Sequence, residues 1–249
     1  QIAISGDSVV GGGRERVFGR QAVVERQGPA SGRAAGLGDD MAMAVERGEC
    51  QFDDPLHQYL PEFAVGDPVV SKLITFRDAM SHRVGIEGHD LLWYRAPWSI
   101  HVAMHKTRHL PLVRPFRSGY EYSSLMVMNA GHALEKATRL TWEQLIERLA
   151  KPMGMSSVQL TSQAAKDHSN RATGYHHTRD GTIRAMAAYE MREPNPAGSI
   201  HATGQDLAAW LKFQLNRGRV NGKAIIDPKQ FEETWNPNVE MDLSDPGIG

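Results

Sequence analysis

The chain contains a single cysteine, Cys50, so it cannot form a disulfide bond within itself, and its redox compartment stays undecided. It has no stretch approaching the roughly 18 consecutive apolar residues that a membrane-spanning helix needs. Residues 1–20 lack the apolar core of a secretory signal peptide. These absences predict no membrane span and no signal peptide in this chain, and they leave compartment and oligomeric state open.

An excess of charge of one sign is also missing. The 28 Lys and Arg residues nearly balance the 29 Asp and Glu residues, which leaves a net charge of −1. Nucleic-acid-binding domains usually carry a basic face. Residues 1–39 contain several arginines, but Phe18 is the only aromatic side chain there that could stack on a base. We therefore expect no nucleic-acid partner.

Several active-site motifs are absent as well. The Gly-x-Ser-x-Gly turn that carries the nucleophile of α/β-hydrolases does not occur, which argues against that fold. Glycine-rich phosphate loops that end in Lys-Ser or Lys-Thr are also missing, so no nucleotide site is indicated. We expect no cofactor.

Three histidines, His101, His105 and His109, are spaced four residues apart and could align on one face of a helix as a metal site. No carboxylate or cysteine stands beside them at ligand spacing, and prolines bracket the segment. The favoured interpretation is therefore a partly exposed helix or lid without a metal. A metal site stays as a weaker alternative.

The two parts of the chain differ in pattern. Residues 1–39 are rich in Gly and Arg and show no steady helical or strand periodicity, which is typical of a flexible segment. Residues 40–249 are patterned like one globular domain. The length is sufficient to bury a hydrophobic core.

The first helix is expected over residues 41–45. Asp39 and Asp40 precede its apolar residues and are favoured as N-caps, and Gly48 supplies a glycine stop. The upstream Gly36 and Gly38 argue against an earlier start, because glycine is costly to order in a helix.

Later helices are predicted from capping patterns and apolar spacing. Their expected positions are a short helix from Thr75, a helix over residues 125–134, a helix from Thr141 that Pro152 ends, and a helix from Thr203 that Gly218 closes. Residues 171–188 alternate around an Asp180-Gly181 turn, which predicts a β-hairpin.

The most informative stretch is residues 115–132, PFRSGYEYSSLMVMNAGH, which place Tyr122 and two hydroxyls at the start of an amphipathic helix. It resembles the second motif, Tyr-x-Asn, of the serine β-lactamase and penicillin-binding-protein superfamily, especially its class C-like, esterase-type branch. Further segments that resemble this superfamily follow in the right order. They are residues 53–63 (DDPLHQYLPEF), 74–86 (ITFRDAMSHRVGI), 89–94 (HDLLWY), 151–155 (KPMGM), 196–200 (PAGSI) and 203–210 (TGQDLAAW).

The resemblance runs from about Met41 to Glu240 and identifies the chain as a member of this superfamily. It implies an α+β fold of the β-lactamase/transpeptidase type, with a helical region packed on an antiparallel sheet. The sheet is expected to be incomplete at both ends, and the domain at 40–249 to be truncated at its C-terminal side relative to the family. Family members are often exported or periplasmic.

The chemistry that the resemblance implies is acyl transfer. A serine attacks a carbonyl carbon, a lysine three residues later on the same helix takes or relays the proton, and a tyrosine assists. A late strand supplies one wall of the oxyanion hole. The expected substrate is a small ester, amide or β-lactam.

This sequence departs from that pattern at each motif. No serine is followed by a lysine three positions later. The family spacing places the nucleophile at Ser31, but the lysine position holds Ala34, so Ser31 is either a nucleophile without its base or a surface-loop serine. The third motif has no counterpart. One hypothesis is that a reading-frame error or gene lesion has replaced the nucleophile segment.

The second motif is partly kept. Tyr122 matches the family tyrosine and is assigned as acid/base partner, with a packing role as the alternative. Ser124 stands where asparagine is usual and is either a catalytic hydroxyl or the helix N-cap. The expected substrate-binding residues are Trp93, Tyr94, Tyr120, Gly198 and Ser199.

The predicted function is accordingly a β-lactamase-related serine hydrolase that works through an acyl-enzyme. The alternative is a catalytically impaired or inactive relative that keeps the scaffold.

Overall fold

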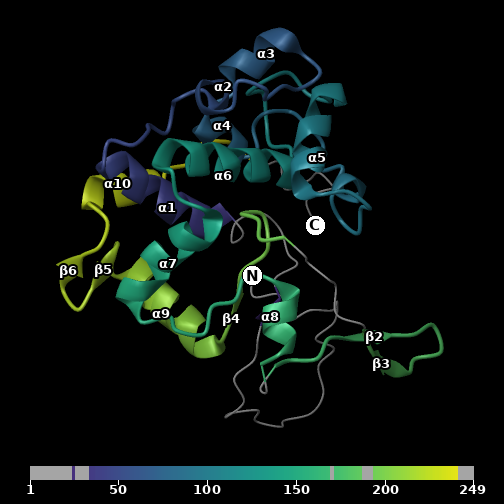
Figure 1. Ribbon diagram of the computed structural model, residues 1–249, viewed down its shortest axis with the longest axis vertical. Helices are drawn as coiled ribbons and strands as arrows, with labels where there is room; N and C mark the ends of the chain where they lie inside the picture. The colour runs from purple at the N-terminus through teal and green to yellow at the C-terminus, as the bar shows by residue number, and fades with distance from the viewer. Residues whose placement is uncertain (1–23, 26–33, 169–170, 187–192, 241–249) are drawn as a thin grey trace.

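The computed structural model describes residues 24–25, 34–168, 171–186 and 193–240 (Figure 1). Ser31 lies outside these residues. The α-helices are α1 (Ala34–Glu46), α2 (Leu56–Tyr59), α3 (Pro68–Leu73), α4 (Phe76–Met80), α5 (Ile100–His105), α6 (Ser124–Thr138), α7 (Trp142–Met153), α8 (Ser162–Lys166), α9 (Gly204–Leu215) and α10 (Pro228–Glu233). Two 3₁₀ helices are η1 (Asp90–Leu92) and η2 (Lys106–His109).

The strands of the described residues form three two-stranded antiparallel sheets. The strands are β1 (Val24–Glu25), β2 (Tyr175–His177), β3 (Ile183–Ala185), β4 (His201–Ala202), β5 (Arg219–Val220) and β6 (Lys223–Ala224). β1 pairs with β4, with Val24 opposite Ala202, so the earliest described strand joins a late one. The molecule is helix-rich with small antiparallel sheets, which confirms the α+β class.

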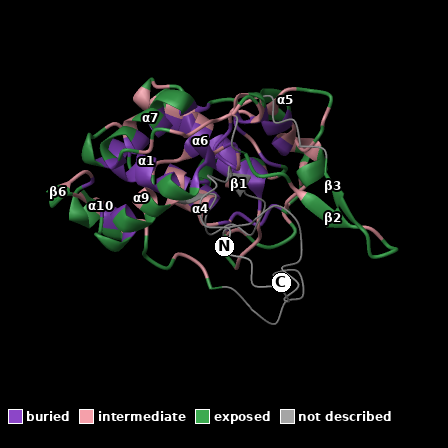
Figure 2. Cartoon of the chain, turned by 90° about the horizontal axis from the view of Figure 1, so that it is seen from below, coloured by how far each residue is buried: buried purple, intermediate pink, exposed green. Residues whose placement is uncertain are grey.

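Helix α6 lies at the centre and packs against α1, α2, α4, α5 and α7 (Figure 1). Ten of its residues between Ser124 and Leu134 are buried, because its first three turns are apolar or small almost all round. Buried residues concentrate on α1, α6 and their neighbours (Figure 2). The core is therefore built around the helix that begins at the Tyr122 motif.

The capping predictions hold where both halves of a capping box are present. Thr75 with Asp78, Thr141 with Gln144, and Thr203 with Asp206 start α4, α7 and α9. In each case the threonine hydroxyl accepts from a backbone N–H that has no partner within the helix. Local chemistry decides these starts, so they could be found from the sequence.

The predicted β-hairpin is also confirmed. β2 pairs with β3, with His176 opposite Arg184, and Gly181 takes the positive φ of 81° that the turn requires. Every residue of the two strands is exposed, and the hairpin projects from the helical body (Figure 1).

Two helix boundaries were predicted wrongly. α1 begins at Ala34 and runs through Gly36 and Gly38, so Asp39 and Asp40 lie inside the helix and cap nothing. The helix therefore crosses residue 40, where the sequence predicts the start of the domain. Packing overrides the glycines, since Leu37 and Met41 are fully buried.

Pro152 does not end α7 but lies within its last turn. Gly154 ends the helix, with a positive φ of 72° and its N–H bonded to the carbonyls of Ala150 and Lys151. Glycine supplies the left-handed conformation that this end needs, whereas the proline removes only one N–H near the end.

None of the described helices is both long enough and apolar enough to cross a membrane.

Candidate active site

Tyr122 lies half-buried in the segment that leads into α6. Its phenol oxygen is 3.1 Å from the hydroxyl oxygen of Ser124, so these two catalytic candidates are brought together. Ser123, and not Ser124, occupies the N-cap position, and Ser124 is the first residue of the helix. The alternative role of Ser124 as N-cap is therefore wrong, because the helix begins one residue earlier than that role requires.

The ring of His82 packs against this segment. The centroid of its ring lies 4.7 Å from that of Tyr122 and 5.6 Å from that of Tyr120. Its Nδ1 accepts a hydrogen bond from the backbone N–H of Ser123 at 3.1 Å. Burial lowers the pKa of His82 to about 4, so the ring is neutral at pH 7.

Tyr120 shares this environment. Burial, the neighbouring Tyr122 and the charge of Glu121 raise the pKa of Tyr120 to about 12, so its phenol keeps its proton at pH 7. The sequence analysis selected Tyr120 but missed His82. The one signal for His82 was its place in the family-like stretch 74–86, which gives no hint that the ring reaches Tyr122.

We call residues 82–85 together with residues 113–123 the tyrosine arm. Its two segments are joined by backbone hydrogen bonds from Val113 to Gly85 (2.9 Å), Arg117 to Arg83 (2.9 Å) and Glu121 to His82 (2.7 Å). Gly85 has a φ of 88°, and a Cβ there would lie 2.4 Å from the carbonyl oxygen of Arg114. Only glycine allows this approach, so the local sequence sets the path of the chain toward Tyr122.

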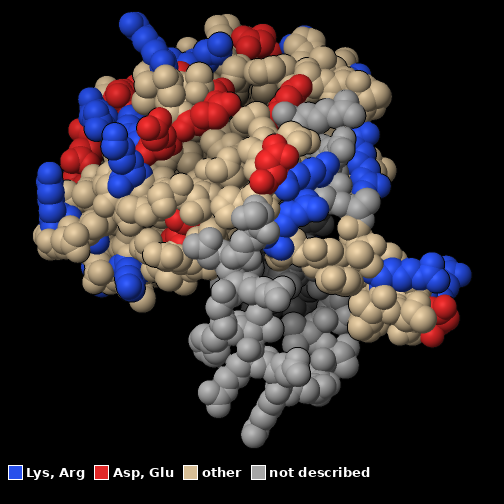
Figure 3. Space-filling model, turned by 60° about the horizontal axis from the view of Figure 1, so that its bottom comes forward, with Lys and Arg blue, Asp and Glu red and all other residues tan. Residues whose placement is uncertain are grey.

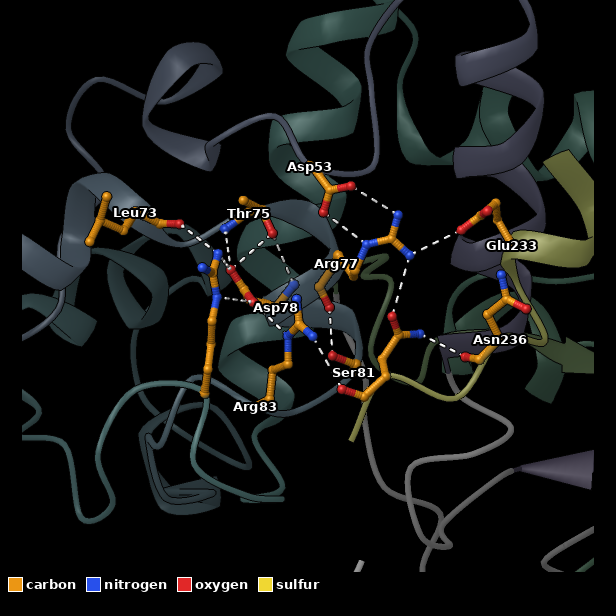
Figure 4. Close-up of polar contacts among 11 residues, drawn as sticks. Asp53, Leu73, Thr75, Arg77, Asp78, Ser81, Arg83, Glu233 and Asn236 are labelled. Carbon is orange, nitrogen blue, oxygen red and sulfur yellow. Dashed lines mark hydrogen bonds and ion pairs between the residues drawn. The ribbon is translucent and has the colours of Figure 1, made fainter. Parts of the chain in front are cut away.

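Asp78 anchors the tyrosine arm to α4 (Figure 4). Its side chain is fully buried and accepts hydrogen bonds from Arg83 at 2.6 Å, from Arg117 at 2.7 Å and from the hydroxyl and backbone N–H of Thr75. Burial alone would raise the pKa of Asp78, but the hydrogen bonds from Arg117, Thr75 and Arg83 outweigh it and lower the pKa. The carboxylate is therefore charged and fully satisfied.

A second part of the same network joins α4 to the C-terminal helix α10. Arg77 binds Asp53 at 2.8 Å and Glu233 at 3.2 Å, as Figure 4 shows, and it also contacts the side chain of Asn238 at 3.3 Å. These ion pairs are structural, since they link elements distant in sequence.

The turn at residues 195–199 packs directly on α6. A Cβ at Gly131 of α6 would lie 2.0 Å from the ring of Pro196, so the turn reaches the helix only because glycine leaves room. Ser199 is fully buried. Its hydroxyl donates to the carbonyl of Asn195 at 2.8 Å and accepts from the Asn195 N–H at 2.9 Å and the Trp142 ring N–H at 3.3 Å.

These contacts engage the Ser199 hydroxyl within the turn. Gly198 beside it is half-exposed, and no atom of the described residues lies within 4 Å of the position that a Cβ on this glycine would take. Of these two expected substrate contacts, only Gly198 has open space beside it. Both roles stay predictions.

Trp93 and Tyr94 follow η1 and contact each other edge to face, with ring centroids 6.0 Å apart. The Trp93 ring N–H donates to Asp90 at 3.0 Å, and the Arg95 guanidinium lies 5.4 Å from the centroid of the Tyr94 ring. Both residues are partly buried. Their roles as a substrate wall stay predictions.

Helix α1, which would follow the family nucleophile, contains two buried carboxyl groups. Asp39 accepts from the Trp210 ring N–H at 3.0 Å and from the Gln214 amide at 2.7 Å. Burial raises the pKa of Asp39 to about 6, against the effect of these hydrogen bonds. This aspartate is therefore buried but at least partly satisfied.

Asp40 is fully buried, and neither of its carboxyl oxygens has a hydrogen-bond partner among the residues that the structure describes. Burial raises the pKa of Asp40 well above its ordinary value, although the charge of Arg148 opposes the shift. Burial of a carboxyl group without such partners destabilises the fold and favours its neutral form. A buried carboxyl group without partners is rare in the packed core of a natural protein.

The three spaced histidines do not form a metal site. His101 lies on α5, His105 at its end and His109 at the end of η2, and all three are exposed. Within the part of the chain that the structure describes, no three His, Cys, Asp or Glu side chains are grouped to hold a metal ion. The metal alternative is wrong, because the helix breaks between the second and third histidine.

The surface of the described residues carries mixed charge. In Figure 3 basic and acidic side chains are interspersed over the helical body. A separate cavity of about 450 Å³ lies along α7 and residues 154–160, and Tyr122 is not among its lining residues. Its apolar side chains include Ile146, Met155, Val158 and Leu160, with Glu143, Glu147 and Lys151 also lining it.

Comparison with known proteins identifies the family. The model of the beta-lactamase family matches residues 41–242, which is most of the chain. This chain belongs to the beta-lactamase family. The match begins seven residues after the start of α1 at Ala34 and includes the tyrosine arm, α6 and the turn at residues 195–199.

Curated relatives of this beta-lactamase-family chain include two fungal hydrolases. Unguisins hydrolase ungD' of Aspergillus campestris is 24% identical over 213 residues, which cover 80% of this chain and 38% of the relative. Unguisins hydrolase ungD of Aspergillus violaceofuscus is 27% identical over 195 residues, which cover 71% and 34%. The chain thus spans little more than a third of the length of the curated relatives it matches.

Solved structures show the same fold. The octameric penicillin-binding protein homologue from Pyrococcus abyssi superposes with a TM-score of 0.71 at 16% identity and covers 86% of this chain and 49% of its own. A D-stereospecific amidohydrolase from Streptomyces gives 0.66 at 17% identity, covering 82% and 63%. EstCE1, a hydrolase with promiscuous acyltransferase activity, gives 0.67 at 15% identity, covering 81% and 61%.

Proposed function

We propose that this beta-lactamase-family hydrolase cleaves a small ester, amide or β-lactam through an acyl-enzyme, with Ser31 as nucleophile and Tyr122 as acid/base partner. The observation that carries the proposal is the 3.1 Å contact between the Tyr122 phenol and the Ser124 hydroxyl at the start of α6. Proton transfer needs a phenol held within hydrogen-bond reach of another hydroxyl, and the tyrosine arm supplies that geometry.

In this proposal the Ser31 oxygen attacks the carbonyl carbon of the substrate. Tyr122 passes the proton between the attacking hydroxyl and the leaving group, and Ser124 orients the phenol. Tyr120, Trp93, Tyr94 and Gly198 would line the substrate site. Water would then release the acyl group from the serine.

The names of similar proteins support an amide or ester as the scissile group. The curated relatives are named as unguisins hydrolases, and two of the solved structures are an amidohydrolase and a hydrolase with acyltransferase activity. An amidohydrolase cleaves an amide bond, and an acyltransferase activity passes an acyl group to an acceptor. We therefore favour an amide or ester substrate over a β-lactam.

A second candidate function is a relative that binds such molecules but does not turn them over. Two observations favour it. No serine in the chain has a lysine three residues later, so the hydroxyl lacks the base that the family uses. Helix α1 also buries the carboxyl group of Asp40, which has no hydrogen-bond partner in the described part of the chain.

Covalent labelling separates the two candidates. A fluorescent phosphonate and a fluorescent penicillin would be incubated with the wild-type chain and with Ser31→Ala, Tyr122→Phe and Ser124→Ala. Circular dichroism would confirm that each sample is folded. We expect weak or absent labelling, because the lysine base is missing.

Weak labelling that disappears in Ser31→Ala and falls in Tyr122→Phe supports the hydrolase. Labelling that survives Ser31→Ala but is lost in Ser124→Ala would move the nucleophile to the start of α6. A folded wild-type chain that takes up neither probe supports the second candidate.

A further inference from the structure

Two different hydrogen-bond acceptors of His82 hold the segment that carries Tyr122. One is its backbone carbonyl and the other is its imidazole. The N–H of Glu121 donates to the backbone carbonyl of His82 at 2.7 Å, and the N–H of Ser123 donates to its Nδ1 at 3.1 Å. Ser123 is extended, with φ −146° and ψ 110°. Alternate N–H groups of an extended segment point to the same side, where a neighbouring strand would supply two carbonyls. Here the imidazole takes the place of the second carbonyl.

The same extended geometry explains the ring contacts. Residues two apart in an extended segment present their side chains on one face. Tyr120 and Tyr122 are two apart, and both rings pack against the His82 ring, at 5.6 and 4.7 Å between centroids. The imidazole therefore fixes the backbone through Nδ1 and supports both phenol rings through its face and edge.

These contacts define the protonation state of His82. Nδ1 can accept the Ser123 N–H only when it carries no proton, so the ring is the neutral tautomer protonated at Nε2. The ring is 4% exposed, and no hydrogen-bond partner of Nε2 is found in the described part of the chain. A buried donor without a partner is unfavourable. An apolar side chain would avoid this loss, but it would leave the Ser123 N–H unpaired instead.

The backbone at His82 is also unusual. Its φ of 58° lies in the left-handed region, where His, Asn and Asp are tolerated better than most residues other than glycine. This conformation turns the chain after α4 so that the carbonyl and the imidazole of one residue face the same extended segment.

We propose that His82 is the positioning residue for Tyr122: its neutral imidazole acts as a substitute strand partner that sets the place of the phenol relative to Ser124. The consequence for catalysis rests on the proposed function above. The positioning itself does not, because it is a property of the folded chain.

Two substitutions separate the parts of this role. His82→Phe keeps an aromatic ring under the tyrosines and removes the acceptor. His82→Asn keeps an acceptor oxygen at the place of Nδ1, tolerates the left-handed backbone and removes the ring. Amide hydrogen exchange at Ser123 reports the imidazole bond, and exchange at Glu121 is the internal control, since its partner is the backbone carbonyl in every variant.

We expect exchange at Ser123 to become about tenfold faster in His82→Phe and to stay close to wild type in His82→Asn, with Glu121 little changed in both. Unchanged protection of Ser123 in His82→Phe would overturn the proposal. So would an equal loss of protection in both variants.

Nitrogen-15 NMR spectra of the histidines in the wild-type chain provide a second test, which does not require any variant to fold. The proposal requires His82 to carry its proton on Nε2 at pH 7, and a proton on Nδ1 would refute it.

Labelling by the phosphonate probe adds the catalytic readout. If the wild-type chain is labelled, we expect His82→Phe to react about tenfold more slowly and His82→Asn to recover part of the rate. Equal rates in all three would show that His82 does not position the phenol for reaction. If the wild-type chain takes up no probe, the proposed hydrolase fails while the exchange measurement still decides the role of His82.

Discussion

Asp78 and Asp40 are both fully buried aspartates, but their hydrogen-bond partners and pKa shifts are opposite. Asp78 receives hydrogen bonds from Arg83, Arg117 and Thr75, and its pKa is lowered. Neither oxygen of Asp40 has a hydrogen-bond partner within the described ranges, and burial raises its pKa. The Asp78 carboxylate is charged and holds two segments together, whereas burial of Asp40 favours its neutral form.

The difference separates two regions of one domain. The tyrosine arm and α4 include segments that resemble the family, and the buried carboxylate of Asp78 accepts hydrogen bonds from Arg83, Arg117 and Thr75. The N-terminal half of α1 carries no such pattern, and it brings two glycines and two aspartates into a packed helix. Consistency between local sequence and fold is the mark of a well-adapted region. By that standard, the buried carboxyl group of α4 is better accommodated than the buried Asp40 of α1.

The largest effect should come from Asp78. Asp78→Ala leaves Arg83 and Arg117 without their buried partner and removes half of the capping box of α4, so we expect the free energy of unfolding to fall by about 3–5 kcal/mol. Urea denaturation would measure it. Glu232→Ala is the matched control, because the Arg217–Glu232 pair is largely exposed and should contribute less than about 1 kcal/mol. Similar losses in both variants would contradict the contrast.

Asp40 should give the opposite sign. Asp40→Ala removes an unpaired carboxyl group and places the best helix former in α1, so we expect the free energy of unfolding to rise by about 2 kcal/mol at pH 7. The control is Asp39→Ala, which leaves the Trp210 and Gln214 donors without their acceptor and should stabilise less. If Asp40→Ala destabilises the fold, the claim that α1 is poorly adapted is wrong.

The two regions should also respond to pH in opposite directions. The pKa of Asp39 rises from its ordinary value of 3.8 to about 6 on folding. The folded state then binds more protons than the unfolded state between these values, so this contribution to stability is lost as pH rises from about 4 through 6. Burial also raises the pKa of Asp40, so its contribution to stability is likewise lost as pH rises.

Asp78 acts in the opposite direction. Because its pKa is lowered in the folded state, its contribution to the free energy of unfolding is lost only as the pH falls into the acid range. Thermal unfolding across pH would measure the profile. The double variant Asp39→Asn with Asp40→Ala should remove the loss above pH 4 and keep the loss in acid. A profile that the double variant leaves unchanged would show that these aspartates do not titrate on unfolding.

The smallest effect on stability is expected at Tyr122. Tyr122→Phe removes one hydrogen bond to Ser124 and keeps the ring on His82, so the free energy of unfolding should change by about 1 kcal/mol or less. Chemical denaturation and phosphonate labelling on the same samples would test this. A loss of several kcal/mol would mean that the phenol is mainly a structural group.

The sequence indicated the helix caps and the motif around Tyr122, but it did not predict the contacts that hold Tyr122 in place. Capping boxes at Thr75, Thr141 and Thr203, and the Asp180-Gly181 turn, depend on residues within four positions, so they could be found without a structure. Tyr122 and Ser124 were selected from a short motif, and their catalytic roles stay predictions. His82 was missed, because its contacts to Tyr120 and Tyr122 join segments about 40 residues apart and no local signal reports them.

The sequence by itself determined the family, the caps and turns, and the absence of a lysine three residues after any serine, because each of these is a matter of residue order over short distances. Tertiary structure alone decided that α1 extends back to Ala34 and that an imidazole holds the segment of Tyr122. It also decided that Asp78 is satisfied while Asp40 is buried without a partner among the described residues. Burial and pairing depend on which distant elements meet, and the free energy of packing α1 against α6, α7 and α10 outweighs the glycines and carboxyl groups that argue against a helix there.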